Sequence, residues 1–99
     1  MQTSLDMIQT VRLTASSRVT LERSYLYAVI LTDDATGQAD IALYDGANTS
    51  GDLLLDLQNL STETLILKLD KPIVFNKGLY LSCGSNVKSV TLMFASIED

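Results

Sequence analysis

The stretch "DKPIVFNKGLYLSCG", residues 70–84, decides the fold class of this chain. Pro72 has no N–H to donate to a β-ladder, so it fits the start of a strand or an edge strand. The triplet at 76–78 is typical of a tight turn that ends in glycine. Apolar and polar residues then alternate through 79–83, which is the period of a half-buried strand. The stretch therefore predicts a strand, a turn and a second strand.

The same two-residue period runs through most of the chain. Apolar and polar residues alternate in 7–13, 17–22, 38–45, 52–57, 62–69 and 87–97, whereas 25–31 is apolar at both parities. A strand that is apolar on both sides suits a central position that is covered on both faces. Turn signals rich in Gly, Asp, Asn and Ser separate these segments at 32–38, 45–51 and 84–86.

This pattern predicts an all-β fold of about eight strands, a single antiparallel β-sandwich of the jelly-roll or immunoglobulin-like kind. For two strands the alternation predicts which residues share the apolar face: Val19 and Leu21 in one strand, and Leu53, Leu55 and Leu57 in the other. The chain has 99 residues, enough for one core. We therefore expect a polar N-terminal arm at 1–6 and one sandwich domain at 7–99.

A helix over 52–69 is the rival interpretation, because this segment is rich in leucine. Asn59 and Ser61 lie in its middle, and both residue types favour turns over helix interiors. The leucines at 65, 67 and 69 also keep the strand period. We therefore expect two strands here.

The charge and cysteine content exclude several classes of protein. The net charge is −5, and the seven Lys and Arg residues are scattered, so we expect no nucleic acid or membrane partner. One cysteine cannot form an internal disulfide. The N-terminus lacks a signal-peptide pattern, and the apolar run at 25–31 is far shorter than the roughly 20 residues that span a bilayer. These features predict a soluble protein made in a reducing cytoplasm.

No catalytic motif is visible. The chain has no histidine, the usual general base and metal ligand. Cys83 therefore lacks an activating partner, and it shares a strand side with Leu79 and Leu81, which predicts a small buried hydrophobe. The five glycines all fall at predicted turns rather than in a phosphate-binding loop. We expect no enzyme and no cofactor.

Oxygen ligands and carboxylates leave two further possibilities. Asp40 and Asp45 are the candidate pair for a glycosidase, which needs two carboxylates facing each other across a sugar. Asp45, Asn48 and Asp52 are candidates for a weak calcium site, although the "DGANTSGD" sequence at 45–52 lacks the spacing of a calcium loop and its closing glutamate. Solvated turn residues are the simpler interpretation, so we expect no catalytic and no metal site.

The remaining signal concerns the surface. Ile66, Tyr80 and Met93 occupy the polar parity of alternating strands, and Tyr25 and Tyr27 begin the doubly apolar strand. Aromatic residues and Met are enriched in the cores of protein interfaces. We therefore predict an interface that uses these five residues. The alternatives are cover by loops, or isolated apolar residues of an ordinary surface.

Two segments, "IALYDGANTSGDLLLDL" at 41–57 and "KPIVFNKGLYLSCGSNVKSVTLMF" at 71–94, resemble small virion proteins of tailed bacteriophages. The shared pattern is a strand ending in Leu-Tyr-Asp, a loop rich in Gly, Ser and Thr, a leucine strand, a Pro-Ile-x-Phe-x-x-Gly-Leu-Tyr segment and a final strand. The positions are Leu43, Tyr44, Asp45, Pro72, Ile73, Phe75, Gly78, Leu79, Tyr80 and Val90 to Leu92. The match spans residues 25–97 and consists mostly of turn and core residues.

The resemblance implies a non-enzymatic structural protein of the virion, assembled in the host cytoplasm. A capsid decoration (cement) protein that binds the major capsid protein across capsomers fits best, with a head-tail accessory as a related role. The resemblance also favours a homo-oligomer, a trimer in particular. The alternative is a receptor- or carbohydrate-binding module of a tail fibre or baseplate, with Tyr44 beside the 45–51 loop as its aromatic residue. A hydrolase using Asp40 and Asp45 is the third hypothesis.

Overall fold

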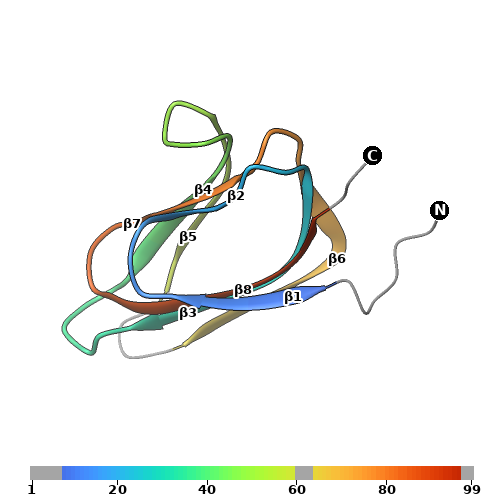
Figure 1. The fold of residues 1–99 in the computed structure, drawn as a ribbon. Coiled ribbons are helices and arrows are strands. Elements are labelled where there is room, and N and C mark those ends of the chain that lie inside the picture. Colours follow the sequence, from blue (N-terminus) through green and yellow to red (C-terminus); the bar gives the residue numbers. More distant parts are fainter. Residues whose placement is uncertain (1–7, 60–63, 97–99) are drawn as a thin grey trace.

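The computed structural model describes residues 8–59 and 64–96, and these fold into β-strands without a helix (Figure 1). The strands are β1 Gln9–Leu13, β2 Ser17–Thr20, β3 Ser24–Asp33, β4 Asp40–Asp45, β5 Asp52–Gln58, β6 Leu65–Phe75, β7 Leu79–Cys83 and β8 Val87–Ser96. They form two antiparallel sheets, sheet A in the order β1-β8-β3-β6 and sheet B in the order β2-β7-β4-β5. The predicted all-β sandwich is confirmed. The rival helix over 52–69 is wrong, because β5 and β6 occupy most of that range.

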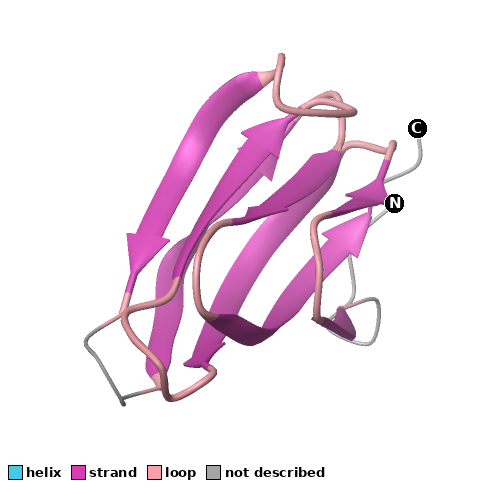
Figure 2. Ribbon diagram, turned by 90° about the vertical axis from the view of Figure 1, so that its left-hand side faces the viewer, coloured by secondary structure: helices cyan, strands magenta, loops and turns pink. Residues whose placement is uncertain are grey.

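The strand order is that of a jelly roll. β1 pairs with β8, β2 with β7, β3 with β6 and β4 with β5, so the chain is a long hairpin rolled up on itself. Rolling brings β8 beside β3 and β7 beside β4, which completes the two sheets. Figure 2 shows the strands and the loops that join them. In an immunoglobulin-like sandwich the first two strands share a sheet. Here β1 and β2 lie in different sheets, so the jelly roll is the correct one of the two predicted architectures.

The core lies between the sheets and is mainly aliphatic. Burial follows the two-residue period: β7 buries Leu79 and Leu81 and leaves Tyr80 half-buried on its other side. The other fully buried large side chains are Leu26, Val29, Leu31, Ile41, Leu43, Phe75, Val90 and Leu92. Burying one such side chain stabilises a fold by about 1.5–3 kcal/mol. The inward assignment of the 79–83 strand is confirmed.

β3 and β6 are both irregular at their middle. Leu26 pairs with Ile73 and Ala28 with Lys68, so Tyr27 is an extra residue in β3 and 69–72 form a larger bulge in β6. Pro72 therefore lies in an unpaired part of a strand that is itself the edge of sheet A, where its missing N–H costs no ladder hydrogen bond. The edge-strand prediction is confirmed, but Pro72 lies inside one long strand rather than at the start of a new one.

Two predicted inner faces are each wrong at one residue, and an irregularity explains each; Val19, Leu55 and Leu57 do pack against the core. β2 ends at Thr20, and Leu21 beyond it is 56% exposed rather than beside Val19 in the core. In β5 the pairing shifts at Leu54, so Leu53 pairs with the outward Tyr44 and is 51% exposed. A one-residue shift moves every later side chain to the other face of the sheet.

The expectation that 25–31 is covered on both faces is also wrong. This segment does form the centre of β3, which lies between β8 and β6. Its inner side is buried, but its outward residues Tyr25 and Ile30 remain half-exposed. The predicted arm at 1–6 and the residue Met7 lie outside the described residues. No helix of the described part is long and apolar enough to cross a membrane.

Hydrogen bonds tie the loops together at both ends of the sandwich. At one end Asn59, 2% exposed, accepts from the backbone N–H of Ala39 through Oδ1 (2.7 Å) and donates through Nδ2 to Asp33 (3.1 Å). Asn86, in the neighbouring turn, accepts the N–H of Asp34 at its carbonyl oxygen (2.9 Å). At the other end Gly46 N–H donates to the carbonyl oxygen of Gly78 (3.2 Å). These bonds hold the strand ends, and hence the outer faces, in fixed positions.

Candidate functional site

A row of four side chains crosses the outer face of sheet B. Arg18 of β2 lies opposite Tyr80 of β7, Tyr80 opposite Tyr44 of β4, and Tyr44 opposite Leu53 of β5. Directly opposed side chains in antiparallel strands approach within about 5 Å at Cβ and interact. We call these four residues the tyrosine row. Both tyrosines are half-buried, whereas Arg18 and Leu53 are exposed.

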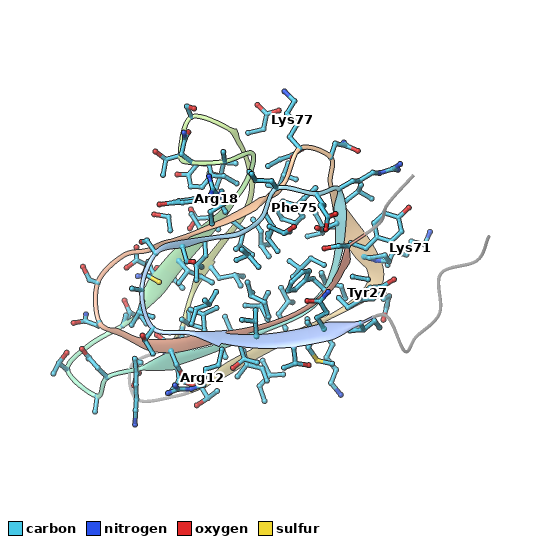
Figure 3. The ribbon with its side chains drawn as sticks, in the orientation of Figure 1. Arg12, Arg18, Tyr27, Lys71, Phe75 and Lys77 are labelled. Atoms are coloured by element: carbon cyan, nitrogen blue, oxygen red, sulfur yellow. The ribbon has the colours of Figure 1, made fainter. Side chains whose placement is uncertain are left out.

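The loops beside the tyrosine row are held rigidly. Asp45 follows Tyr44 and points inward, where its carboxylate accepts the backbone N–H of Lys77 (2.7 Å). That bond and the Gly46–Gly78 bond join the 46–51 loop to the 76–78 turn. Figure 3 shows Lys77 at the same end of the molecule as the 46–51 loop. The base of the loop beside the row is thus tied to the 76–78 turn.

A second cluster lies on the outer face of sheet A. Ile66 of β6 is 59% exposed and pairs with Ile30 of β3; Met93 of β8 is 37% exposed and pairs with Ala28 of β3. We call these four residues the aliphatic patch. Lys68, opposite Ala28, and Arg12, opposite Thr91, lie beside it. Figure 3 shows Arg12 pointing away from the interior on this side.

Tyr25 and Tyr27 lie elsewhere. Tyr25 faces outward from sheet A between Val74 and Ala95, and the guanidinium carbon of Arg23 lies 5.8 Å from the centre of its ring. A cation at this distance is attracted by the ring face. Tyr27 is the extra residue of the β3 bulge, and it lies at the same end of the molecule as Lys71 (Figure 3).

The five residues predicted for an interface are therefore divided. Ile66 and Met93 lie on one outer face together, with Tyr25 farther along the same sheet. Tyr80 lies on the other sheet and belongs to the tyrosine row. A single contact that joins Tyr80 to Ile66 and Met93 is excluded, because the core separates the two outer faces.

The carboxylates do not form a facing pair. Asp40 and Asp45 begin and end β4 and fall on opposite sides of it. The Asp40 carboxylate accepts the backbone N–H of Ser85 (2.9 Å), while Asp45 is buried and bonded to Lys77. The two carboxylates therefore cannot face each other across a bound sugar, and the hydrolase hypothesis that relies on this pair loses its basis.

Two of the three candidate calcium ligands, Asp45 and Asp52, lie opposite each other where β4 and β5 pair, but the Asp45 carboxylate is already bonded to the N–H of Lys77. Asp45 points into the protein, Asn48 Oδ1 accepts the N–H of Ser50 within the loop (2.9 Å), and Asp52 begins β5. Within 8–59 and 64–96 no three His, Cys, Asp or Glu side chains are grouped as metal ligands are. The loop therefore supports itself through its own hydrogen bonds.

Cys83 packs against the core from the end of β7. Burial raises the pKa of its thiol, and a hydrogen bond with the Ser16 hydroxyl offsets this only in part. A thiol that stays protonated is a poor nucleophile. Cys83 is half-buried rather than buried, so the predicted small buried hydrophobe is correct in its contact with the core but not in its full burial.

Sequence reasoning missed Arg18 and Leu53 as members of a surface cluster. Arg18 was one scattered cation, and Leu53 was assigned to the core. The signal that unites them is the cross-strand register, which requires the strand order and the shift at Leu54. The role of Asn59 was also missed: the sequence predicts only a turn there, but its side chain is buried and holds three segments together.

Comparisons with known proteins add no relative. No family model matches the chain, and no curated protein and no solved structure matches it.

Proposed function

We propose that this chain is a non-enzymatic structural protein of a tailed-phage virion, most specifically a capsid decoration protein that binds the major capsid protein across capsomers. The resemblance of segments 41–57 and 71–94 to such proteins is one support. The jelly roll is another, because capsid proteins commonly use it. Each bound copy would stabilise the head, since a ligand that binds only the assembled state favours that state.

The observation that carries the proposal is the aliphatic patch. Ile66 and Met93 project from a regular part of sheet A together with Ile30, and the cations Lys68 and Arg12 lie at its margin. An apolar centre with a charged rim is the usual organisation of a protein interface. In this proposal the patch contacts the capsid and the cations meet acidic groups there.

Binding to phage heads tests the proposal. Heads that lack this chain are mixed with the purified protein and sedimented, and the bound fraction is measured for the natural chain, Ile66→Lys and Met93→Lys. Each substitution places a charge in the centre of the interface, and we expect at least about tenfold weaker binding, the usual effect of losing a central contact. Leu53→Lys is the matched control on sheet B and should bind normally. Equal binding by all four proteins contradicts the proposal.

The second candidate function is recognition of a carbohydrate or receptor by a tail fibre or baseplate module. The tyrosine row favours it, because Tyr44 and Tyr80 lie side by side with Arg18 next to them. Aromatic faces stack on sugars, and a guanidinium binds carboxylate groups of acidic sugars. A glycan array probed with the natural chain and with Tyr44→Ala and Tyr80→Ala tests this function. Signals that both substitutions abolish support it, and an array without signal removes it.

A further inference from the structure

The four edge strands of the sandwich differ in how well they are protected. Edges expose unpaired backbone groups, and proteins shield them with short strands, bulges, proline and cations. β6 carries Pro72 in a large bulge, β2 is four residues long with an irregular register, and β1 carries Arg12. β5 has seven residues, no proline and no cation, and β4 is its only strand neighbour among the described residues.

β5 is also unusually exposed along its length. Leu53 is 51% and Leu54 39% exposed, so this strand carries two of the five large hydrophobic side chains that are exposed in the described part of the chain. Leu55 and Leu57 pack only partly against the core. An edge strand with apolar side chains and free backbone groups is a site at which another strand adds to the sheet.

The backbone of β5 points specific groups at this edge. The N–H of Asn59 donates to the carbonyl oxygen of Ala39 (3.0 Å), so residue 59 faces the line of β4. Hydrogen-bonding groups alternate in direction along a strand. Asp56 and Gln58 therefore direct their N–H and C=O groups away from β4. The shift at Leu54 limits the regular part of the strand to Leu55–Gln58.

Charge selects the partner and the register. In a symmetric antiparallel pair, residues that face each other lie on the same side of the sheet. The two-fold axis must therefore pass between one residue and the same residue of the second copy. An axis through Asp56 would oppose two carboxylates, which is unfavourable. An axis through Leu57 instead places Asp56 opposite Gln58 of the second copy, twice. The Gln58 amide donates one N–H to Gln38 Oε1 within the chain (3.2 Å), and its second N–H can then donate to the carboxylate. The outward backbone groups of both residues also pair.

We propose that two copies of this chain join through β5, antiparallel about Leu57, so that their B sheets become one continuous sheet. The join uses neither the aliphatic patch nor capsid binding, so it can fail or hold independently of the proposed function. It also differs from the trimer that the resemblance favours, because a two-fold axis through one strand closes with two copies.

The mass of the purified chain in solution tests the pairing. Size exclusion with light scattering, run over a wide range of protein concentration, should give a monomer that converts to a dimer. Gln58→Lys opposes the partner's Asp56 with a cation and should lower the dissociation constant, whereas Gln58→Glu should raise it. Each substitution acts at two symmetric positions, so we expect the dissociation constant to change about two- to thirtyfold, downward for Gln58→Lys and upward for Gln58→Glu.

Gln9→Lys and Gln9→Glu control for net charge, because Gln9 is exposed on β1, at the edge of the other sheet. These variants should leave the dissociation constant close to that of the natural chain. A monomer at every concentration overturns the proposal. So does a trimer, or a dimer that responds equally to changes at positions 9 and 58.

A backbone variant gives an independent test. Asp56→Pro removes an N–H that points at the free edge and leaves the bonds to β4 in place, so it should fold and remain a monomer. Hydrogen exchange of the natural chain checks the same bonds without substitution. The amides of Asp56 and Gln58 should gain protection as concentration rises, while that of Thr91 in the middle of sheet A should not change. Unchanged exchange at 56 and 58 in a dimeric sample contradicts the pairing.

Discussion

Asn59 shows how one buried side chain fixes several segments of this fold. Its amide accepts from Ala39 just before β4 and donates to Asp33 at the end of β3, and its own N–H donates to Ala39. The residue type favours a turn, and the sequence predicts that much. Its burial could not be predicted, because the three segments meet only when β3, β4 and β5 are assembled.

We expect Asn59→Ala to destabilise the protein by about 1–3 kcal/mol, the cost of leaving a buried N–H without its partner. Urea unfolding followed by circular dichroism measures the change. Asn48→Ala is the matched control, since Asn48 bonds only within an exposed loop, and it should cost less than about 1 kcal/mol. Equal losses for the two variants would contradict the role of Asn59.

Gly78 occupies a backbone conformation that suits only glycine. Its φ is +141°, and a Cβ there would lie 2.7 Å from the carbonyl oxygen of Thr20. Gly78→Ala should therefore cost about 1–3 kcal/mol of backbone strain, measured by thermal unfolding. At Gly37 the added Cβ would meet the side-chain amide of Asn86 instead. A side chain can move, so Gly37→Ala should destabilise the protein less than Gly78→Ala. A larger loss of stability for Gly37→Ala would show that the 76–78 turn accommodates the added Cβ.

Cys83 gives a prediction about pH. Burial raises the pKa of its thiol above the ordinary value, so the folded protein holds this proton more tightly than the unfolded chain does. The stabilisation is complete below the pKa of an unfolded thiol and is lost as the pH rises through the folded one. We expect iodoacetamide to alkylate Cys83 more slowly than a free cysteine. In Cys83→Ser, the loss of stability at alkaline pH that comes from this thiol should disappear. Alkylation at the rate of the urea-unfolded chain would contradict it.

At the scale of elements, alternation predicts where strands lie better than which way their side chains point. The apolar faces of 38–45 and 79–83 are correct because β4 and β7 are regular over those residues. Leu21 and Leu53 were assigned wrongly because a strand ends early in one case and shifts register in the other. Bulges arise from the fit between paired strands, so a single strand's sequence does not reveal them.

Pro72 tests the description of the β6 bulge. Because residues 69–72 are unpaired with β3, Pro72→Ala restores an N–H that no ladder needs. The expected loss is about 0.4–1 kcal/mol, which reflects the greater freedom of the unfolded chain. Val29→Pro, in the central strand β3 between β8 and β6, removes an N–H that points at a neighbouring strand and should prevent folding. A large loss for Pro72→Ala in denaturant unfolding would show that the bulge is a strained and necessary feature.

At the scale of the whole molecule, the jelly roll decides which surface residues can act together. The sequence predicts a sandwich, and its turn spacing predicts the number of strands. It does not reveal that β8 lies beside β3 and β7 beside β4, because these neighbours are far apart along the chain. Ile66 and Met93 therefore fall on one face and Tyr80 on the other, and two separate candidate surfaces replace the one expected.

The most direct test of the proposed role is to locate this chain on the phage particle. A cryo-electron microscopy reconstruction of heads saturated with the protein shows both its position and the face that it buries. We predict density for the jelly roll at the boundaries between capsomers, with the outer face of sheet A and Ile66 and Met93 against the capsid. Heads without such density, or copies bound through the tyrosine row with the aliphatic patch open to solvent, would contradict the account.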